Sequence, residues 1–288
     1  MKSPEERSYL GIDLGATLIK HTLISSGGTP GPVQRIETDA SDGRDSVLEQ
    51  LRKIITETGN SPEGSHLAAV GLGTPGLINN RGEIIGEAVN IPGWHDFPLQ
   101  ETLRSCTDLS VFVANDVSLT AFGEYVYGAG RNGTSRNLVC ISVGTGIGGG
   151  LVLDGELYLG SSGLAAEIGH LIVEPGGVPC GCGQKGCLEQ YASAKGMVRA
   201  CLEMSRTCKP PLAELAAGSP GKITAEVIFR YLREGDTLAA RITLRASRML
   251  ARGIGHTINL LSPDMVVLCG GVMRSADLLL PEILDHLD

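Results

Sequence analysis

The sequence predicts an α/β fold built as two related lobes that face each other across a cleft. The first half of the 288-residue chain alternates strand, helix and strand, which is typical of α/β proteins. A glycine-containing hairpin pattern occurs twice, at 11–28 and at 142–156. This internal repeat favours two similar lobes, although glycine hairpins are also common without any duplication.

Hydrophobic periodicity predicts the elements in order. In the first half we expect a hairpin at 8–28, a helix at 45–60, strands at 67–76 and 109–117, and a helix at 118–130. The helix at 45–60 has one apolar face, formed by Val47, Leu48, Leu51, Ile54 and Ile55. In the second half we expect a hairpin at 136–158, helices at 193–205, 224–235 and 238–262, a strand at 264–273 and a helix from 275.

Charge and hydropathy exclude several classes of protein. The net charge is −8 with no basic run, which disfavours a nucleic-acid partner. The first residues lack the apolar core of a signal peptide, and no apolar run reaches the ~20 residues of a membrane span. We therefore expect a cytoplasmic protein without a membrane partner, whose scattered cysteines are buried apolar residues or reduced thiols.

Two glycine turns are candidates for phosphate binding, although the sequence contains no Walker-type P-loop. Glycine lets consecutive backbone N–H groups point at an anion, and a threonine hydroxyl adds a donor. The first turn has Gly15 and Thr17, and the second has Gly144, Thr145 and Gly146. Asp13 ends the first strand and could hold Mg²⁺. The alternative is that both turns serve only to close hairpins.

A second candidate feature is the pair Asn115–Asp116 at the end of a predicted buried strand, where α/β sheets bind ligands. A carboxylate there can accept the proton of a hydroxyl that attacks a phosphoryl group. A helix N-cap is the competing interpretation. The loop at 88–94, with its Pro-Gly turn and an amide, could offer polar groups to a polyol or simply be a turn.

The segment 179–189 raises a choice between a redox centre, a disulfide and a metal site. Neighbouring cysteines in Cys-x-Cys cannot pair without strain, and no CxxC motif is present. Three thiolates and an upstream histidine suit tetrahedral zinc. We predict a closed, structural Cys₃His site made by His170, Cys180, Cys182 and Cys187. The metal would then fix two nearby carboxylates, Glu167 and Glu189, as rigid acceptors for sugar hydroxyls.

Seven segments together resemble the ROK sugar kinases, and among them especially the bacterial glucokinases. They are GIDLGAT, GLGTPG, NIPGW, VFVANDVSLTAFGE, ISVGTGIGGGLVLDG, AAEIGHLIV and CGCGQKGCLEQYAS. The resemblance extends from Tyr9 to Leu287 and implies an actin-like, hexokinase-type fold with duplicated ribonuclease-H-like lobes. We therefore expect a small N-terminal lobe at 1–117 and a larger C-terminal lobe with the zinc site at 118–288.

The resemblance also implies a reaction, the transfer of the γ-phosphoryl group of ATP to a hexose hydroxyl, with glucose as the expected sugar. Asp116 matches the catalytic base. The matching sugar contacts are Asn90, Asn115, Glu167, His170 and Glu189. The matching nucleotide contacts are Gly15, Thr17, Gly144, Thr145, Gly146, Gly270 and Gly271. Because family members are commonly homodimers, a homodimer is expected.

The sequence departs from the family pattern at three places. Ala16 replaces a glycine and either crowds the phosphate or is absorbed, and Leu18 replaces a common Lys or Asn. Family members usually run on for about another strand and helix beyond the last residue here. The alternatives are a kinase for N-acylmannosamine, fructose or another hexose, a non-catalytic sugar-binding protein, and a ROK repressor. Only eight residues precede Tyr9, where the resemblance begins, which disfavours the repressor's helix-turn-helix domain.

Overall fold

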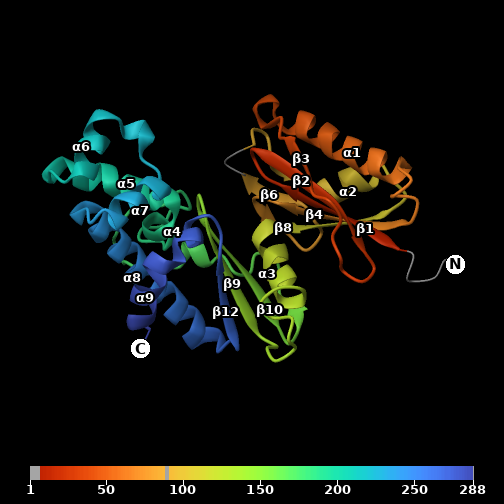
Figure 1. Ribbon diagram of the computed structural model, residues 1–288. Coiled ribbons are helices and arrows are strands. Elements are labelled where there is room, and N and C mark those ends of the chain that lie inside the picture. The colour runs from red at the N-terminus through yellow and green to blue at the C-terminus, as the bar shows by residue number, and fades with distance from the viewer. Residues whose placement is uncertain (1–6, 88–90, 288) are drawn as a thin grey trace. The chain divides into compact units, whose positions relative to one another are not determined.

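The computed structural model describes residues 7–87 and 91–287 and divides into two compact units. The N-terminal unit comprises Met1–Gly123 and Tyr158–Ala165, and the C-terminal unit comprises Glu124–Leu157 and Ala166–Asp288. Each unit contains its own main sheet (Figure 1). Each unit also has its own buried apolar cluster.

The N-terminal unit is built on a five-stranded sheet in the order β3-β2-β1-β4-β8. Its strands are β1 (Ser8–Leu14), β2 (Leu18–Ser25), β3 (Gln34–Glu37), β4 (Leu67–Thr74) and β8 (Ser110–Asn115). β1 pairs with β2 as an antiparallel hairpin and with β4 in parallel, and β4 pairs in parallel with β8. The carboxyl ends of β1, β4 and β8 therefore meet at one edge of the sheet.

Helix α1 (Arg44–Asn60) covers this sheet with the apolar face that the sequence predicts. Its buried residues are Val47, Leu48, Leu51, Ile54 and Ile55, which join the cluster formed by the sheet and by α2 (Leu99–Arg104). Each such aliphatic side chain contributes about 1.5–3 kcal/mol when it is buried. Burial of this face, rather than helix propensity alone, therefore holds α1 on the sheet.

A small three-stranded sheet, which the sequence pattern did not predict, completes the N-terminal unit. It consists of β5 (Leu77–Ile78), β6 (Ile84–Glu87) and β7 (His95–Phe97). Trp94 precedes β7 and is fully buried, with its Nε1–H donating to Thr74 Oγ1 at 3.2 Å. Its ring meets Phe97 edge-on, at 5.1 Å between centroids. The end of the 88–94 loop is thus anchored in the core.

The C-terminal unit repeats the central arrangement of the N-terminal sheet. Its four strands lie in the order β11-β10-β9-β12. They are β9 (Leu138–Val143), β10 (Ile147–Leu153), β11 (Glu156–Leu157) and β12 (Met265–Cys269). β9 pairs with β10 as a hairpin and with β12 in parallel, as β1 does with β2 and β4. The duplicated hairpin predicted from the sequence is confirmed.

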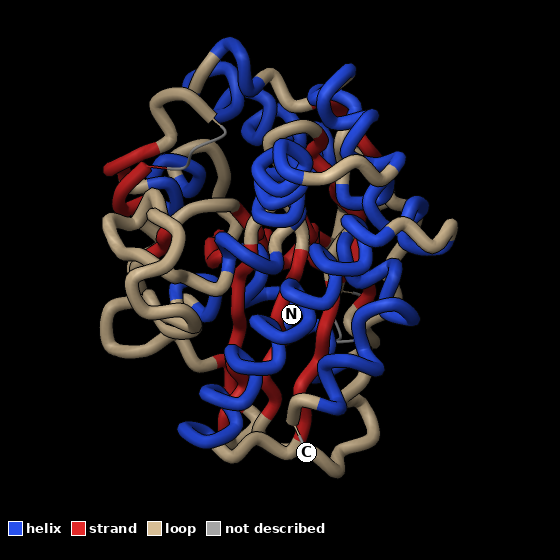
Figure 2. The backbone as a smooth tube through the Cα atoms, turned by 90° about the vertical axis from the view of Figure 1, so that its left-hand side faces the viewer, coloured by secondary structure: helices blue, strands red, loops and turns tan. Residues whose placement is uncertain are grey.

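Helices supply most of the C-terminal core, and Figure 2 shows them lying over the strands. They are α4 (Glu189–Ala192), α5 (Ala194–Met204), α6 (Pro211–Gly218), α7 (Ala225–Arg233), α8 (Thr237–Leu261) and α9 (Ala276–Asp285), while α3 (Asp116–Val126) has residues in both units. Short 3₁₀ turns are η2 (Ala40–Asp42), η3 (Ile168–His170), η4 (Ser205–Thr207), η5 (Pro220–Lys222) and η6 (Val272–Ser275). Among the described residues, no helix is both long and apolar enough to span a bilayer.

Candidate active site

Asn115 and Asp116 lie at the carboxyl end of β8, where the strand passes directly into α3. Asn115 Oδ1 accepts the N–H groups of Val117 at 2.9 Å and Ser118 at 3.2 Å, and its Nδ2 donates to Gly76 O at 3.2 Å. Asn115 therefore caps the helix, as the competing interpretation of this pair expects. One amide hydrogen remains for another partner, because the oxygen already accepts two N–H groups.

The Asp116 carboxylate accepts the N–H of Val117 at 2.9 Å through Oδ1. Burial raises the pKa of Asp116 above its usual value, and the negative charge of Asp13 raises it further. The backbone N–H of Val117 acts in the opposite direction but does not cancel the effect. A carboxylate with a raised pKa binds a proton more readily, which suits a general base.

The first glycine turn is closed by its own backbone and by a distant threonine. Gly15 N–H donates to Leu18 O at 3.0 Å, and Thr38 Oγ1 donates to Gly15 O at 2.7 Å. The Ala16 methyl group packs against the N-terminal apolar cluster, so the extra carbon is absorbed by the core. The exposed Thr17 hydroxyl group belongs to the same turn.

Asp13 forms an ion pair that the sequence pattern did not predict. Lys20 Nζ lies 2.8 Å from Asp13 Oδ2, because the two residues are paired across the β1–β2 hairpin. Both side chains are about half exposed, and such pairs contribute only ~0.2–1 kcal/mol. The pair can therefore open when a divalent cation or a phosphate approaches.

The second glycine turn joins β9 to β10 in the C-terminal unit. Gly144 N–H donates to Gly146 O at 2.9 Å, while the N–H groups of Thr145 and Gly146 donate to no other residue of the described chain. Consecutive free backbone N–H groups of this kind form an anion-binding nest. The turn therefore has donors available for a phosphate group.

Gly270 and Gly271 follow β12 beside the end of β9. Gly270 has φ +94°, and a Cβ atom there would lie 2.5 Å from Val143 O. Only glycine combines this left-handed conformation with so close an approach to the neighbouring strand. The Gly270 segment is therefore packed next to the strand that leads into the second turn.

The predicted metal ligands converge in the C-terminal unit. One donor atom from each of His170, Cys180, Cys182 and Cys187 lies within 4.8 Å of the others. Cys182 Sγ is 3.6 Å from Cys187 Sγ, and Cys180 Sγ is 3.6 Å from His170 Nδ1. Tetrahedral zinc separates two thiolates by about 3.8 Å, and a thiolate from an imidazole nitrogen by about 3.6 Å. The donor set and its spacing therefore fit Zn²⁺.

Two neighbouring carboxylates accompany this metal group. Glu167 directly precedes η3, which contains His170, and Glu189 opens α4 two residues after Cys187. Although the Glu167 side chain reaches solvent, partial burial raises its pKa; the His170 charge lowers it and the Glu189 charge raises it. The electrostatic coupling shows that Glu167, His170 and Glu189 lie near one another. Ala166, with φ +69°, sets the backbone direction into Glu167.

The predicted site residues thus fall into a set in each unit. The N-terminal unit holds Asp13, Gly15, Thr17, Asn115 and Asp116, and the C-terminal unit holds Gly144, Thr145, Gly146, Glu167, His170, Cys180, Cys182, Cys187, Glu189, Gly270 and Gly271. Asn90 lies outside the described residues.

The ROK family model matches residues 9–287. The chain belongs to the ROK family.

Two curated relatives illustrate the range of ROK activities. The chain is 36% identical over 270 residues to a glucokinase of Thermotoga maritima, with 94% of this chain and 84% of that protein covered. It is 32% identical over 263 residues to an N-acetylmannosamine kinase of Escherichia fergusonii, with 91% and 82% covered.

Solved ROK structures confirm the expected actin-like, hexokinase-type α/β fold. A ROK hexokinase from Thermus thermophilus superposes with a TM-score of 0.81 at 31% identity, covering 97% of this chain and 89% of that one. A ROK glucokinase from Streptomyces griseus, in complex with glucose and AMPPNP, superposes with a TM-score of 0.78 at 30% identity. That match covers 97% of this chain and 88% of that one.

In this ROK chain a cavity of about 670 Å³ opens beside the second glycine turn, within the C-terminal unit. Its polar lining includes Thr145, Lys195, Arg199, Thr224 and Glu226. These residues come from the turn, from α5 and from the start of α7, which are far apart in sequence. No motif joins them, so the sequence alone could not reveal this cavity.

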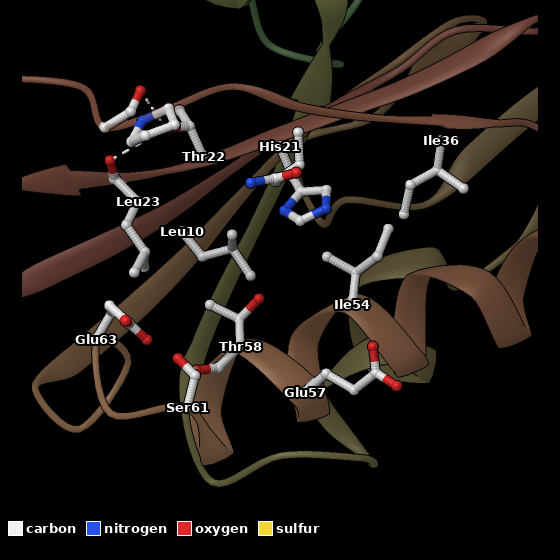
Figure 3. Close-up of a pocket in the computed structure, with 13 residues that line it drawn as sticks. Leu10, His21, Thr22, Leu23, Ile36, Ile54, Glu57, Thr58, Ser61 and Glu63 are labelled. Carbon is white, nitrogen blue, oxygen red and sulfur yellow. Dashed lines mark hydrogen bonds between the residues drawn. The ribbon is translucent and has the colours of Figure 1, made fainter.

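A second cavity, of about 500 Å³, lies in the N-terminal unit between α1 and the β1–β3 strands. Figure 3 shows His21 of β2 opposite Ile54 and Glu57 of α1. Burial lowers the pKa of His21, which keeps the ring neutral near pH 7. No predicted site residue lines this cavity, so it is separate from the candidate active site.

Proposed function

We propose that this chain is an ATP-dependent hexose kinase that converts glucose to glucose 6-phosphate. The observation that carries the proposal lies within the C-terminal unit. There, Glu189, two residues after the metal ligand Cys187, accepts the N–H of Ile147, which directly follows a glycine turn with free N–H donors. A site for hydroxyl groups thus adjoins a site for phosphate. The Thermotoga maritima glucokinase and the glucose complex of the Streptomyces griseus enzyme support the same reaction.

Asp116 is proposed as the general base. It accepts the proton of the sugar hydroxyl while that oxygen bonds to the γ-phosphorus of ATP. The bond from the γ-phosphorus to the β–γ bridging oxygen breaks, and ADP leaves with that oxygen. The raised pKa of Asp116 favours this proton transfer.

The sugar is proposed to bind through the side chains that match the family's sugar contacts. These are Asn90, Asn115, Glu167, His170 and Glu189. If Nδ1 of His170 holds the metal, Nε2 stays available to a sugar hydroxyl. The two glutamates act as acceptors for hydroxyl donors. A zinc ion held by His170, Cys180, Cys182 and Cys187 would have four protein ligands and no open position, so we propose that the metal is structural.

ATP is proposed to bind at the two glycine turns and at the end of β12. The phosphate contacts are Gly15, Thr17, Gly144, Thr145 and Gly146, with Gly270 and Gly271 toward the adenosine. Asp13 is proposed to hold Mg²⁺ once its ion pair with Lys20 opens. The cavity beside Thr145 offers room and polar groups for the nucleoside.

We further propose lobes at 1–117 and 118–288, a homodimer and a place in cytoplasmic sugar catabolism, where glucose 6-phosphate enters glycolysis. None of the eight cysteines, all within the described ranges, forms a disulfide. Reduced cysteines and a thiolate metal site fit a reducing compartment.

An ADP-release assay with glucose, N-acetylmannosamine, fructose and mannose tests the proposal. We expect glucose to give the highest kcat/KM, and Asp116→Asn to lower kcat by about 10²–10⁴-fold with glucose binding retained in calorimetry. The Escherichia fergusonii relative favours N-acetylmannosamine as the second candidate. A preference for that sugar would replace glucose in the proposal, and no turnover with any hexose would refute the kinase assignment.

A further inference from the structure

We propose that Glu189 also positions the second glycine turn, so that the metal loop supports nucleotide binding even without sugar. This inference rests on the proposed function, since it assigns ATP phosphates to the turn at 144–146. Glu189 would then serve both substrates: one carboxylate oxygen holds the turn, and the other remains available to a sugar hydroxyl.

The contact that carries the inference joins Glu189 directly to the turn. Glu189 Oε2 accepts the N–H of Ile147, the residue that follows the turn, at 3.0 Å. Any Cβ atom on Gly146 would collide with that same oxygen, so the glycine leaves the space that the carboxylate fills. A backbone N–H bonded to a partly buried carboxylate is a strong, charge-assisted hydrogen bond.

The segment that follows Glu189 holds the turn at two further points. Ala194 N–H donates to Gly144 O at 2.9 Å, and Lys195 N–H donates to Thr145 O at 3.4 Å. The start of α5 thus binds the carbonyl groups on one side of the turn. The free N–H groups of Thr145 and Gly146 are thereby left for an anion.

The same segment is tied to the metal ligands at its other end. Glu189 is two residues from Cys187, and the adjacent Gln190 donates through Nε2 to Cys180 Sγ at 3.5 Å. Bound zinc would fix Cys180 and Cys187, and therefore the backbone from which Glu189 reaches the turn. All of these contacts lie within the C-terminal unit.

Calorimetric titration with Mg·ADP in the absence of sugar tests the inference. Glu189→Asp keeps the charge but is too short to reach Ile147 N, whereas Glu189→Gln keeps the reach without the charge. We expect Glu189→Asp and Glu189→Ala to lower ADP affinity by about 10-fold or more. Glu189→Gln should keep an ADP affinity within about 3-fold of wild type. Chelation of the metal should weaken ADP binding as Glu189→Ala does.

Glu167→Ala is the matched control, because it removes the other carboxylate beside the metal without touching the turn. It should weaken glucose binding and leave ADP affinity within about 3-fold of wild type. Circular dichroism and bound-zinc measurements identify any variant that fails to fold. Equal ADP affinity in wild type and Glu189→Asp would overturn the inference and leave the kinase proposal standing. Absence of ADP binding to the wild type would instead overturn the proposed function, and the inference with it.

Discussion

Burial and the nearby charge of Asp13 disfavour the ionised form of Asp116. The ionised carboxylate should therefore lower the free energy of unfolding at neutral pH. Its pKa is raised in the folded protein, so folding is destabilised as pH rises through the range in which only the unfolded chain has lost this proton. We expect Asp116→Asn to melt higher than wild type at pH 7, by about 2–4 °C for each kcal/mol gained. The difference should shrink as pH falls toward 3.8, the ordinary pKa of an aspartate side chain. Equal melting temperatures of wild type and Asp116→Asn at pH 7 would contradict this prediction.

The charge of Asp13 should tune the pH dependence of turnover through Asp116. Because Asp13 raises the pKa of Asp116, Asp13→Asn should lower it and move the acidic limb of log kcat/KM to lower pH. Lys20→Gln is the control, since it removes the cation that partly neutralises Asp13. It should raise the pKa of Asp116 and move the acidic limb to higher pH. If both variants leave the acidic limb in place, Asp116 is not the base that this limb reports.

The sequence could predict which residues gather at the metal group, but not every contact around it. Closely spaced cysteines and an upstream histidine indicated the ligand set, because that spacing suits few other roles. The Asp13–Lys20 pair depends on hairpin register, and the Glu189–Ile147 bond joins residues 42 apart in sequence. Such contacts follow from packing and leave no local pattern to read.

Adjacent glycines at the end of β12 differ sharply in what they tolerate. Gly270→Ala places a Cβ against Val143 O in a left-handed conformation, so it should destabilise the protein by about 2–5 kcal/mol. At Gly271 a Cβ meets nothing within 4 Å, so Gly271→Ala should be nearly neutral for stability. Urea unfolding of the two variants provides the comparison. Equal losses would show that the close approach of β12 to β9 is absent.

Elements with strong periodicity were predictable, and short ones were not. The hairpins, α1, α5, α7 and α8 lie where the hydrophobic patterns placed them. The strands β5, β6 and β7 have only two to four residues each, and β5 and β7 come shortly after a Pro-Gly dipeptide, so no alternation could develop. Helix α6 begins with a proline at its first position, where proline is also typical of a loop.

The two units have separate apolar cores, and only the C-terminal unit contains the metal group. We therefore expect two calorimetric transitions, one for each unit. A chelator should lower the melting temperature of the C-terminal unit by roughly 5–10 °C, because it removes several kcal/mol of metal-binding energy. The other transition should not move. Cys106→Ser is a control, since this cysteine lies in the N-terminal unit away from the metal group. One transition that shifts as a whole would contradict independent units.

The buried indole of Trp94 is an intrinsic fluorescence probe of the N-terminal unit. The chain contains a single tryptophan, and its ring is shielded from solvent beside Thr74 and Phe97. Intrinsic emission excited in the indole band therefore follows the unfolding of one unit only, whereas far-ultraviolet dichroism follows both. An unlabelled sample with two optical signals can thus assign each melting event to its own half of the chain.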